Sequence, residues 1–411
     1  MDITINPKKL CGSVEAPASK SVAHRMLICA ALAEGKSTVR INASSEDIEA
    51  TANCLRAIGA DINVNGCNWE ITPPVTLPEK ATLDCGESGS TLRFMLPVAA
   101  ALGIEATFTG RGRLPSRPVG ILLDAMESHG VEIVSRDFPI HIKGKLGCGE
   151  YSVLGNVSSQ FITGLLLALS YCNGESVVKL IPPVESRSYI NITTNVLKSF
   201  GVEITENRDS YIIKGGSVKR GSFTAEGDWS NAAFWLAAGV ETYGLNENSV
   251  QGDRAMAEVL RRFGAELSYS DGRLKANVEN LKGIRLDASD IPDLVPIISV
   301  TAACAEGETV IYNASRLRLK ESDRIETTVR LINNLGGEAR ATQDGLIIKG
   351  KKRLSGGEVD GCGDHRIVMS AAIASCRCDN PVIIRGAQAV AKSYPEFFNK
   401  FNSLGGEANV M

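Results

Sequence analysis

LRRFGAE at residues 260–266 is one of six copies of a short signature in this chain of 411 residues. Two apolar positions precede a glycine, and a small residue or valine and usually an acid follow it; His129 takes one apolar position in the second copy. The glycines, 63 to 72 residues apart, are Gly59, Gly130, Gly201, Gly264, Gly336 and Gly405. Such a glycine is typical of an amphipathic helix that ends and turns into a strand. The signature predicts six copies of one structural unit.

A second helix pattern, apolar nearly all round and therefore buried, precedes each signature. Its six copies are residues 22–32, 92–102, 161–169, 232–238, 294–305 and 367–374. Pro97 and Pro296 lie near the starts of two of them, and we expect a proline to break or kink its helix unless it lies in the first turn. With the strand-like stretches between, each unit reads βαβαββ. Six units exceed one core, which predicts an α/β (α+β) fold of two domains with three units each.

The last unit is incomplete, because only six residues follow Gly405. We expect the strand-like stretch at residues 3–5 to supply the missing edge strand. The predicted domains are therefore a discontinuous domain of residues 1–18 and 226–411 and an inserted domain of residues 19–225. The chain would cross between them near residues 16–18 and again near 224–227, and two crossings at one place predict a hinge.

Composition argues against several classes of function. The net charge of −3 gives no field for nucleic-acid binding. The first residues show no basic stretch followed by an apolar core, and the longest apolar run, residues 161–169, is too short to cross a membrane. Eleven cysteines without a C-x-x-C pair indicate reduced thiols rather than disulfides or a zinc site. We expect a cytoplasmic protein that binds neither nucleic acid nor membrane and holds no metal.

Polar and charged residues gather where the helices begin. Capping accounts for Ser19, Ser158, Asp228 and Asp364. It does not account for cations at the same places, because a cation opposes the helix dipole and costs roughly a few tenths of a kcal/mol unless an anion offsets it. The cations are Lys20, Arg25, Arg93, Arg117, Arg187, Arg324, Arg366 and Lys392. Since helices of one repeat run in a common direction, their starts predict an anion receptor on each domain.

The stretch LKESDR at residues 319–324 concentrates this pattern. Ser322 or Asp323 can cap the helix that follows it. The candidate acids and bases are Asp293, Glu321 and Lys20, all at helix starts. A carboxylate among cations has a lowered pKa, which suits a base. The sequence has no H-E-x-x-H motif, and its Gly-rich basic loop at residues 110–117 lacks the G-K-[ST] ending of a P-loop.

Three motifs carry a resemblance to a known family: KESDR at 320–324, DHR at 364–366 and SSQ at 158–160. With the sixfold repeat, they make the whole sequence similar to the enolpyruvyl transferases, and among these to the 5-enolpyruvylshikimate-3-phosphate synthases. The resemblance implies a two-domain inside-out α/β barrel with its active site in the interdomain cleft. It implies transfer of the enolpyruvyl group of phosphoenolpyruvate to the 5-hydroxyl of shikimate 3-phosphate, with release of phosphate, through a tetrahedral intermediate. It also implies small-molecule substrates, no cofactor, no metal and a monomer.

The resemblance further implies roles for single residues. Asp293 is the expected base, while Glu321 and Lys20 are expected to move the other proton. The residues expected to bind shikimate 3-phosphate are Lys20, Ser21, Arg25, Ser158, Ser159, Gln160, Ser186, Tyr189, Asp293 and Lys320. The residues expected to bind phosphoenolpyruvate are Lys20, Gly89, Arg93, Arg117, Gln160, Arg324, Arg366 and Lys392. Glu87 and Arg316 stand where the family often has asparagine, and neither is included in these sets.

Two other functions stay open at this point. The UDP-N-acetylglucosamine enolpyruvyl transferases share the fold and the donor, but usually carry a cysteine in the loop that corresponds to residues 110–117 and an asparagine after the first lysine. Here that loop has no cysteine, and Ser21 follows Lys20. A non-catalytic anion-binding protein on the same scaffold would keep the cations and lose the acids and bases, yet Asp293 and Glu321 are both present.

Overall fold

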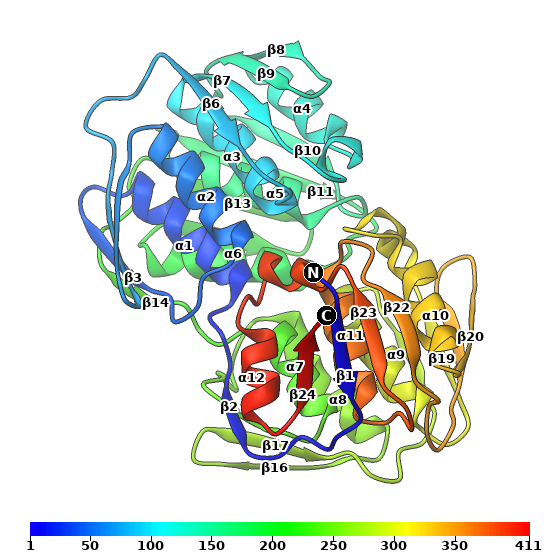
Figure 1. Ribbon diagram of the computed structural model, residues 1–411. Coiled ribbons are helices and arrows are strands. Elements are labelled where there is room, and N and C mark those ends of the chain that lie inside the picture. Colours follow the sequence, from blue (N-terminus) through cyan, green and yellow to red (C-terminus); the bar gives the residue numbers. More distant parts are fainter. The chain divides into compact units, whose positions relative to one another are not determined.

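The chain forms two compact units in the computed structural model, which describes residues 1–411. We call Ala18–Ala225 the inserted unit, and Met1–Pro17 together with Glu226–Met411 the terminal unit. Each unit holds six α-helices and three four-stranded sheets (Figure 1). No helix is both long enough and apolar enough to cross a membrane.

The inserted unit is built around three buried helices. These are α1 (Lys20–Leu32), α3 (Gly89–Leu102) and α5 (Ser159–Leu169). Its other helices are α2 (Glu46–Ala57), α4 (Gly120–Glu127) and α6 (Arg187–Ser199), with the 3₁₀ turn η1 (Leu114–Ser116). Its sheets consist of β3 (Ser37–Arg40), β4 (Asp61–Asn65), β5 (Asn68–Thr72) and β14 (Ser222–Thr224); β6 (Lys80–Asp84), β7 (Glu105–Thr109), β8 (Val131–Ser135) and β9 (Ile140–Gly144); and β10 (Glu150–Leu154), β11 (Glu175–Ile181), β12 (Glu203–Asn207) and β13 (Ser210–Lys214).

The terminal unit repeats this plan. Its buried helices are α7 (Trp229–Ala237), α9 (Val295–Ala303) and α11 (His365–Ser375). Its other helices are α8 (Met256–Arg262), α10 (Arg324–Asn334) and α12 (Phe397–Ser403), with the 3₁₀ turns η2 (Gly252–Ala255), η3 (Pro292–Leu294), η4 (Ser315–Leu319) and η5 (Ala387–Lys392). Its sheets consist of β2 (Ser13–Glu15), β15 (Glu241–Tyr243), β16 (Glu266–Ser270) and β17 (Arg273–Asn277); β18 (Arg285–Asp287), β19 (Glu308–Tyr312), β20 (Glu338–Ala341) and β21 (Leu346–Lys349); and β1 (Ile3–Asn6), β22 (Gly357–Asp360), β23 (Val382–Arg385) and β24 (Glu407–Val410).

All six sheets share one strand order. In the sheet β6-β7-β9-β8, the strands β6 and β7 are parallel, β9 pairs antiparallel with β7, and β8 pairs antiparallel with β9. The buried helix α3 connects the parallel pair, and α4 leads into the hairpin. The predicted α/β fold class with repeated βαβαββ units is confirmed. All six signature glycines follow their helices with positive φ, between 76° and 101°, as a helix-terminating glycine requires.

At each boundary between the units, the last strand before the boundary pairs with a strand of its own unit. β2, just before Pro17, pairs in parallel with β15, and β14, just before Ala225, pairs in parallel with β3. β1 pairs with both β23 and β24, so it is an interior strand, whereas we expected an edge strand. It takes the position that the second hairpin strand has in the other sheets, because the chain after Gly405 has room for one strand only.

Pro97 does not break its helix, contrary to one of the two outcomes expected for it. Pro97 lies in the middle of α3, not in its first turn, and α3 continues to Leu102. Pro97 cannot donate to the Arg93 carbonyl oxygen, four residues earlier. Gly164 of α5 packs directly against this carbonyl, since a Cβ atom on Gly164 would overlap it. Close packing of two buried helices therefore stabilises the helix across a residue that local propensity disfavours. Pro296 lies in the first turn of α9, where proline is tolerated.

Candidate functional site

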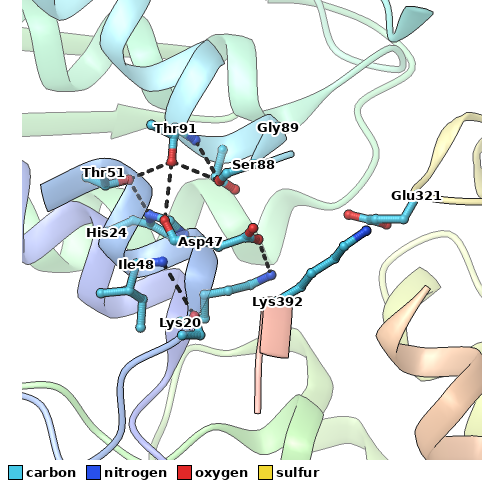
Figure 2. A network of polar contacts seen from close by, with 12 residues as sticks. Lys20, His24, Asp47, Ile48, Thr51, Ser88, Gly89, Thr91, Glu321 and Lys392 are labelled. Atoms are coloured by element: carbon cyan, nitrogen blue, oxygen red, sulfur yellow. Dashed lines mark hydrogen bonds and ion pairs between the residues drawn. The ribbon is translucent and has the colours of Figure 1, made fainter. Parts of the chain in front are cut away.

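The starts of α1, α2 and α3 meet at one end of the inserted unit. Lys20, the first residue of α1, places its Nζ 2.8 Å from Oδ2 of Asp47 in the first turn of α2. The Thr91 hydroxyl of α3 donates to the Asp47 carbonyl oxygen at 3.4 Å. Asp47 therefore holds the ammonium of Lys20 at this end, as Figure 2 shows.

A buried polar chain fixes these three helix starts together (Figure 2). His24 Nδ1 lies 2.6 Å from the Thr51 hydroxyl, which lies 2.7 Å from the Thr91 hydroxyl, and the Thr91 hydroxyl lies 2.8 Å from the Ser88 hydroxyl. Ser88 also caps α3 by accepting from the Thr91 amide. Burial, assisted by the charges of Lys20 and Arg25, holds the pKa of His24 well below its ordinary value. His24 is therefore neutral, and its contacts give it a structural task.

The start of α3 lies against two guanidinium groups. Gly89 has no side chain, and a Cβ atom there would lie 2.5 Å from Arg117 Nη1 and 2.6 Å from Arg93 Nη1. Arg93 donates to Gln160 Oε1 of α5 at 2.9 Å and to the Pro118 carbonyl oxygen at 2.8 Å. Two guanidinium groups thus lie against a helix N-terminus whose amides carry partial positive charge, an arrangement suited to phosphate or carboxylate.

Arg25 of α1 connects its helix to two others, α5 and α6, at this end of the inserted unit. Its buried guanidinium donates to Thr193 Oγ1 at 2.8 Å, to the Tyr189 carbonyl oxygen at 3.1 Å and to Thr163 Oγ1 at 3.2 Å. Burial lowers the pKa of Arg25 to about 9, so the side chain keeps its charge at neutral pH. These bonds join α1, α5 and α6.

The remaining expected residues of this unit lie at the same helix starts. Ser158 caps α5 by accepting from the Gln160 amide at 3.3 Å. Ser186 precedes α6 with φ +51°, and Tyr189 lies in the first turn. Ser21 accepts from Arg25 through its carbonyl oxygen. Arg187 is the first residue of α6, but its guanidinium is directed to the hairpin of β12 and β13, where it donates to the Arg208 carbonyl oxygen.

In the terminal unit, Asp293 contacts three cations: Lys320, which precedes α10, Arg324, which begins α10, and Arg366 in the first turn of α11. Its Oδ1 accepts from Arg324 Nη1 at 2.8 Å and from Lys320 Nζ at 3.2 Å, and its Oδ2 from Arg366 Nη2 at 3.2 Å. Burial lowers the pKa of Lys320, against the attraction of Asp293. Cationic neighbours within hydrogen-bond distance favour the charged form of a carboxylate.

Arg324 is almost wholly buried, with 1% of its side chain exposed. It donates to Glu321 at 2.7 Å and to both oxygens of Asp364, at 2.8 and 3.2 Å. Burial lowers the pKa of Arg324, but Asp364, Glu321 and Asp293 together raise it above the ordinary arginine value. The side chain that caps α10 is Asp323, which accepts from the Glu326 amide, whereas Ser322 donates to Asp364.

Lys392 and Asp253 extend this end of the terminal unit. Lys392, the last residue of η5, donates to the Gly363 carbonyl oxygen at 2.7 Å, just before α11. Asp253 is buried in η2 and accepts a short hydrogen bond from Ser230. Burial, and then repulsion by Asp293, raise the pKa of Asp253 to about 7.

The expected site residues thus fall into two sets, each gathered within its own unit. Sequence reasoning left three acids out of the site: Asp47, which pairs with Lys20; Asp364, which pairs with Arg324; and Asp253, which is buried and accepts from Ser230. All three lie at helix starts, so their position was visible in the sequence, but their partners were not. Glu87 lies against the backbone of Gly112, where its carboxylate would overlap an added Cβ atom. No group of three or more His, Cys, Asp or Glu side chains is placed to hold a metal.

Comparison with known proteins gives consistent matches. The family model of EPSP synthase (3-phosphoshikimate 1-carboxyvinyltransferase) matches residues 5–401. The 3-phosphoshikimate 1-carboxyvinyltransferase of Clostridium kluyveri is 42% identical over 98% of this chain and 97% of its own, and that of Clostridium acetobutylicum is 39% identical over 99% and 98%. The structure of EPSP synthase from Acinetobacter baumannii superposes over 100% of both chains with a TM-score of 0.82 at 27% identity. The enolpyruvyl transferase NikO from Streptomyces tendae, at 16% identity and a TM-score of 0.82, shows the same fold.

Proposed function

The chain belongs to the EPSP synthase family and transfers the enolpyruvyl group of phosphoenolpyruvate to shikimate 3-phosphate, and we propose that the two gathered sets of helix-start residues perform this transfer. The substrates bring two phosphates and two carboxylates, a total charge of roughly −5. Planar guanidinium groups match both kinds of anion. A charge of this size accounts for cations at helix starts, which would otherwise oppose the helix dipoles.

The proposed roles divide between the units. In the inserted unit, Gly89, Arg93 and Arg117 hold phosphoenolpyruvate, and Lys20 contacts both substrates. In the terminal unit, Lys320 binds shikimate 3-phosphate, and Arg324 and Arg366 bind the donor. The remaining proposed contacts with shikimate 3-phosphate are Ser21, Arg25, Ser158, Ser159, Gln160, Ser186, Tyr189 and Asp293; those with phosphoenolpyruvate are Gln160 and Lys392.

The proposed chemistry is addition followed by elimination. Asp293 removes the proton of the 5-hydroxyl, whose oxygen attacks the central carbon of phosphoenolpyruvate, while Glu321 and Lys20 deliver a proton to the methylene carbon. The cations stabilise the negative charge of the tetrahedral intermediate. Reversal of the methylene protonation then expels phosphate and leaves the enolpyruvyl ether. The observation that carries the proposal is the Asp293 carboxylate, accepting from Lys320, Arg324 and Arg366 at 2.8 to 3.2 Å.

The test exchanges this carboxylate for an amide. Asp293→Asn keeps the size and polarity of the side chain but removes the base, so we expect kcat to fall by about 10²–10⁴. Shikimate 3-phosphate binding, measured by calorimetry, should stay within about tenfold of the unmodified protein. The control is Asp290→Asn, an exposed carboxylate three residues earlier, which should leave kcat unchanged. A near-normal kcat for Asp293→Asn would refute the assignment of the base.

We further propose that the protein works as a monomer in the cytoplasm. All eleven cysteines are free thiols, which suits a reducing compartment. Light scattering should give the mass of one chain, 43.8 kDa, at micromolar concentration. A concentration-independent dimer mass would contradict this.

A further inference from the structure

A cavity of about 710 Å³ lies in the terminal unit, away from the helix starts that carry Asp293. It is lined by the C-terminal ends of the buried helices α7, α9 and α11, by the end of β17, and by the N-terminal segment Pro7–Gly12. The nine residues of α9 alone separate its two ends by roughly 12 Å. The volume lies within the range of about 300–1,000 Å³ that is usual for small-molecule sites.

The cavity lining carries more positive than negative side chains. Five cations line the cavity, but only one acid, Glu279. Lys8 pairs with Glu407 at 2.8 Å, Lys9 pairs with Glu279 at 3.5 Å, and Arg353 pairs with Asp379. The other two, Lys275 and Arg377, form no ion pair.

Both of these cations lie on the cavity lining. Arg377 donates one N–H to the Val278 carbonyl oxygen at 2.9 Å. A guanidinium has five N–H donors, so others remain for a ligand. Lys275 lies three residues before Val278, about 10 Å of extended chain. A cation near the C-terminus of α11 complements the helix dipole, which accounts for Arg377. The dipole does not account for Lys275, which lies on a strand.

Part of the remaining lining is apolar, beside the polar residues Asn277 and Thr301. Leu281, Val300 and Ile373 present buried side chains. Cys304 and Cys376 also line the cavity, and burial raises the pKa of these thiols to about 11 and about 12. Both are therefore neutral and behave as small apolar groups.

We propose that this cavity binds a small organic carboxylate, with its acid group at Lys275 and Arg377 and its apolar body against Val300 and Ile373. This site is separate from the one that carries the transfer reaction, so either can fail without the other. Binding needs both the acid group and the apolar body of the ligand. The cations form charge-assisted hydrogen bonds with the acid group, and the apolar residues bury the surface of the body.

The test uses 2-naphthoate as the probe, titrated calorimetrically into the full chain with saturating shikimate 3-phosphate. We expect one molecule of 2-naphthoate to bind per chain. Lys275→Gln and Arg377→Gln should each weaken it about tenfold or more. The matched control is Lys349→Gln, an exposed lysine of the same unit, which should leave affinity unchanged. Neutral 2-naphthol and inorganic phosphate, which each carry one half of the ligand's chemistry, should bind at least about tenfold more weakly.

Several results would overturn the proposal. They are no binding of 2-naphthoate at millimolar concentration, binding that shikimate 3-phosphate abolishes, equal affinity in Lys275→Gln, and equal affinity for 2-naphthol. Lys275 is exposed and makes no ion pair, so Lys275→Gln tests the proposal even if Arg377→Gln does not fold. Lys275→Gln should also keep the transferase activity, which shows that the active site is intact.

Discussion

Arg324 illustrates how a buried cation is kept charged and in place. Its guanidinium is bonded by Asp293, Glu321 and Asp364, which reach it from three segments of the chain. Two of these acids have proposed catalytic roles, whereas Asp364 has no exposed surface and caps α11. Asp364 therefore positions Arg324, and through it the two other carboxylates. Removing one partner of a buried ion pair leaves a buried charge that is poorly compensated.

Asp364→Ala should destabilise the protein by about 3–5 kcal/mol, because Arg324 loses two hydrogen bonds and α11 loses its cap. Urea unfolding at pH 7 measures the change. The control is Asp360→Ala, an exposed acid four residues earlier, expected to cost no more than about 1 kcal/mol. Equal losses for the two variants would show that Asp364 does not stabilise Arg324.

Asp253 predicts a dependence of stability on pH. Its pKa is raised from the ordinary 3.8 to about 7, so between these values the folded state keeps a proton that the unfolded state has released. The stability that this proton gives is complete below pH 4 and is lost as pH rises through 7. Asp253→Asn cannot ionise and should therefore gain stability relative to the unmodified protein between pH 4 and 7, on the order of a few kcal/mol.

Urea unfolding of both proteins at pH 5, 6, 7 and 8 tests this. The groups that set the pKa besides burial are Asp293, Arg366, Ser230 and Asp228. The stability difference between variant and parent should grow up to about pH 7 and then level off. A difference that does not change with pH would contradict a proton on Asp253.

For single residues, the sequence predicts which cations belong to the site but not which acids pair with them. Lys20, Arg93 and Arg324 stand out because they lie at helix starts, where a dipole argument needs only local information. Pairs such as Lys20 with Asp47 or Arg324 with Asp364 join residues 27 and 40 positions apart. Such pairs depend on how helices pack. Ser322 and Asp323 were equivalent candidates for the cap of α10, and packing against Asp364 decides between them.

At the scale of elements, α3 and α5 form the closest contact of two buried helices that the glycine positions reveal. Gly164→Ala should destabilise the protein by about 1–3 kcal/mol, because the new methyl group overlaps the Arg93 carbonyl oxygen. The variant should also lower transferase activity, since Arg93 and Gln160 lie on the two helices that it forces apart.

The matched control is Gly120→Ala in α4, where an added Cβ atom meets nothing within 4 Å. Alanine is the better helix former, so this variant should be neutral or more stable by up to about 1 kcal/mol. Thermal and urea unfolding of both variants separate the effect of crowding from that of helix propensity. Equal stability changes would refute the close packing of α3 and α5.

Helices and their ends followed from sequence more closely than strand positions did. The six signature glycines mark a local event, a turn with positive φ, which sequence encodes directly. The place of β1 depends instead on which strands remain unpaired in its sheet, a property of the assembled unit. Likewise, Pro97 is disfavoured by local propensity and accommodated by tertiary packing.

At the scale of the whole molecule, one unit repeated six times supplies twelve helix starts, and the two units use theirs in different ways. The inserted unit places two guanidinium groups against the helix start at Gly89. The terminal unit offers a carboxylate surrounded by cations at Asp293. Binding of the anionic donor and removal of a proton are thus proposed for different parts of one chain. This division accounts for a reaction that needs many cations and a base.

Phosphate release from phosphoenolpyruvate tests this account most directly. The purified protein should release phosphate when shikimate 3-phosphate is the acceptor, at a rate proportional to enzyme concentration. It should release none with UDP-N-acetylglucosamine, and Asp293→Asn should abolish most of the signal while Asp290→Asn keeps it. Phosphate release with the UDP-sugar and none with shikimate 3-phosphate would contradict the account.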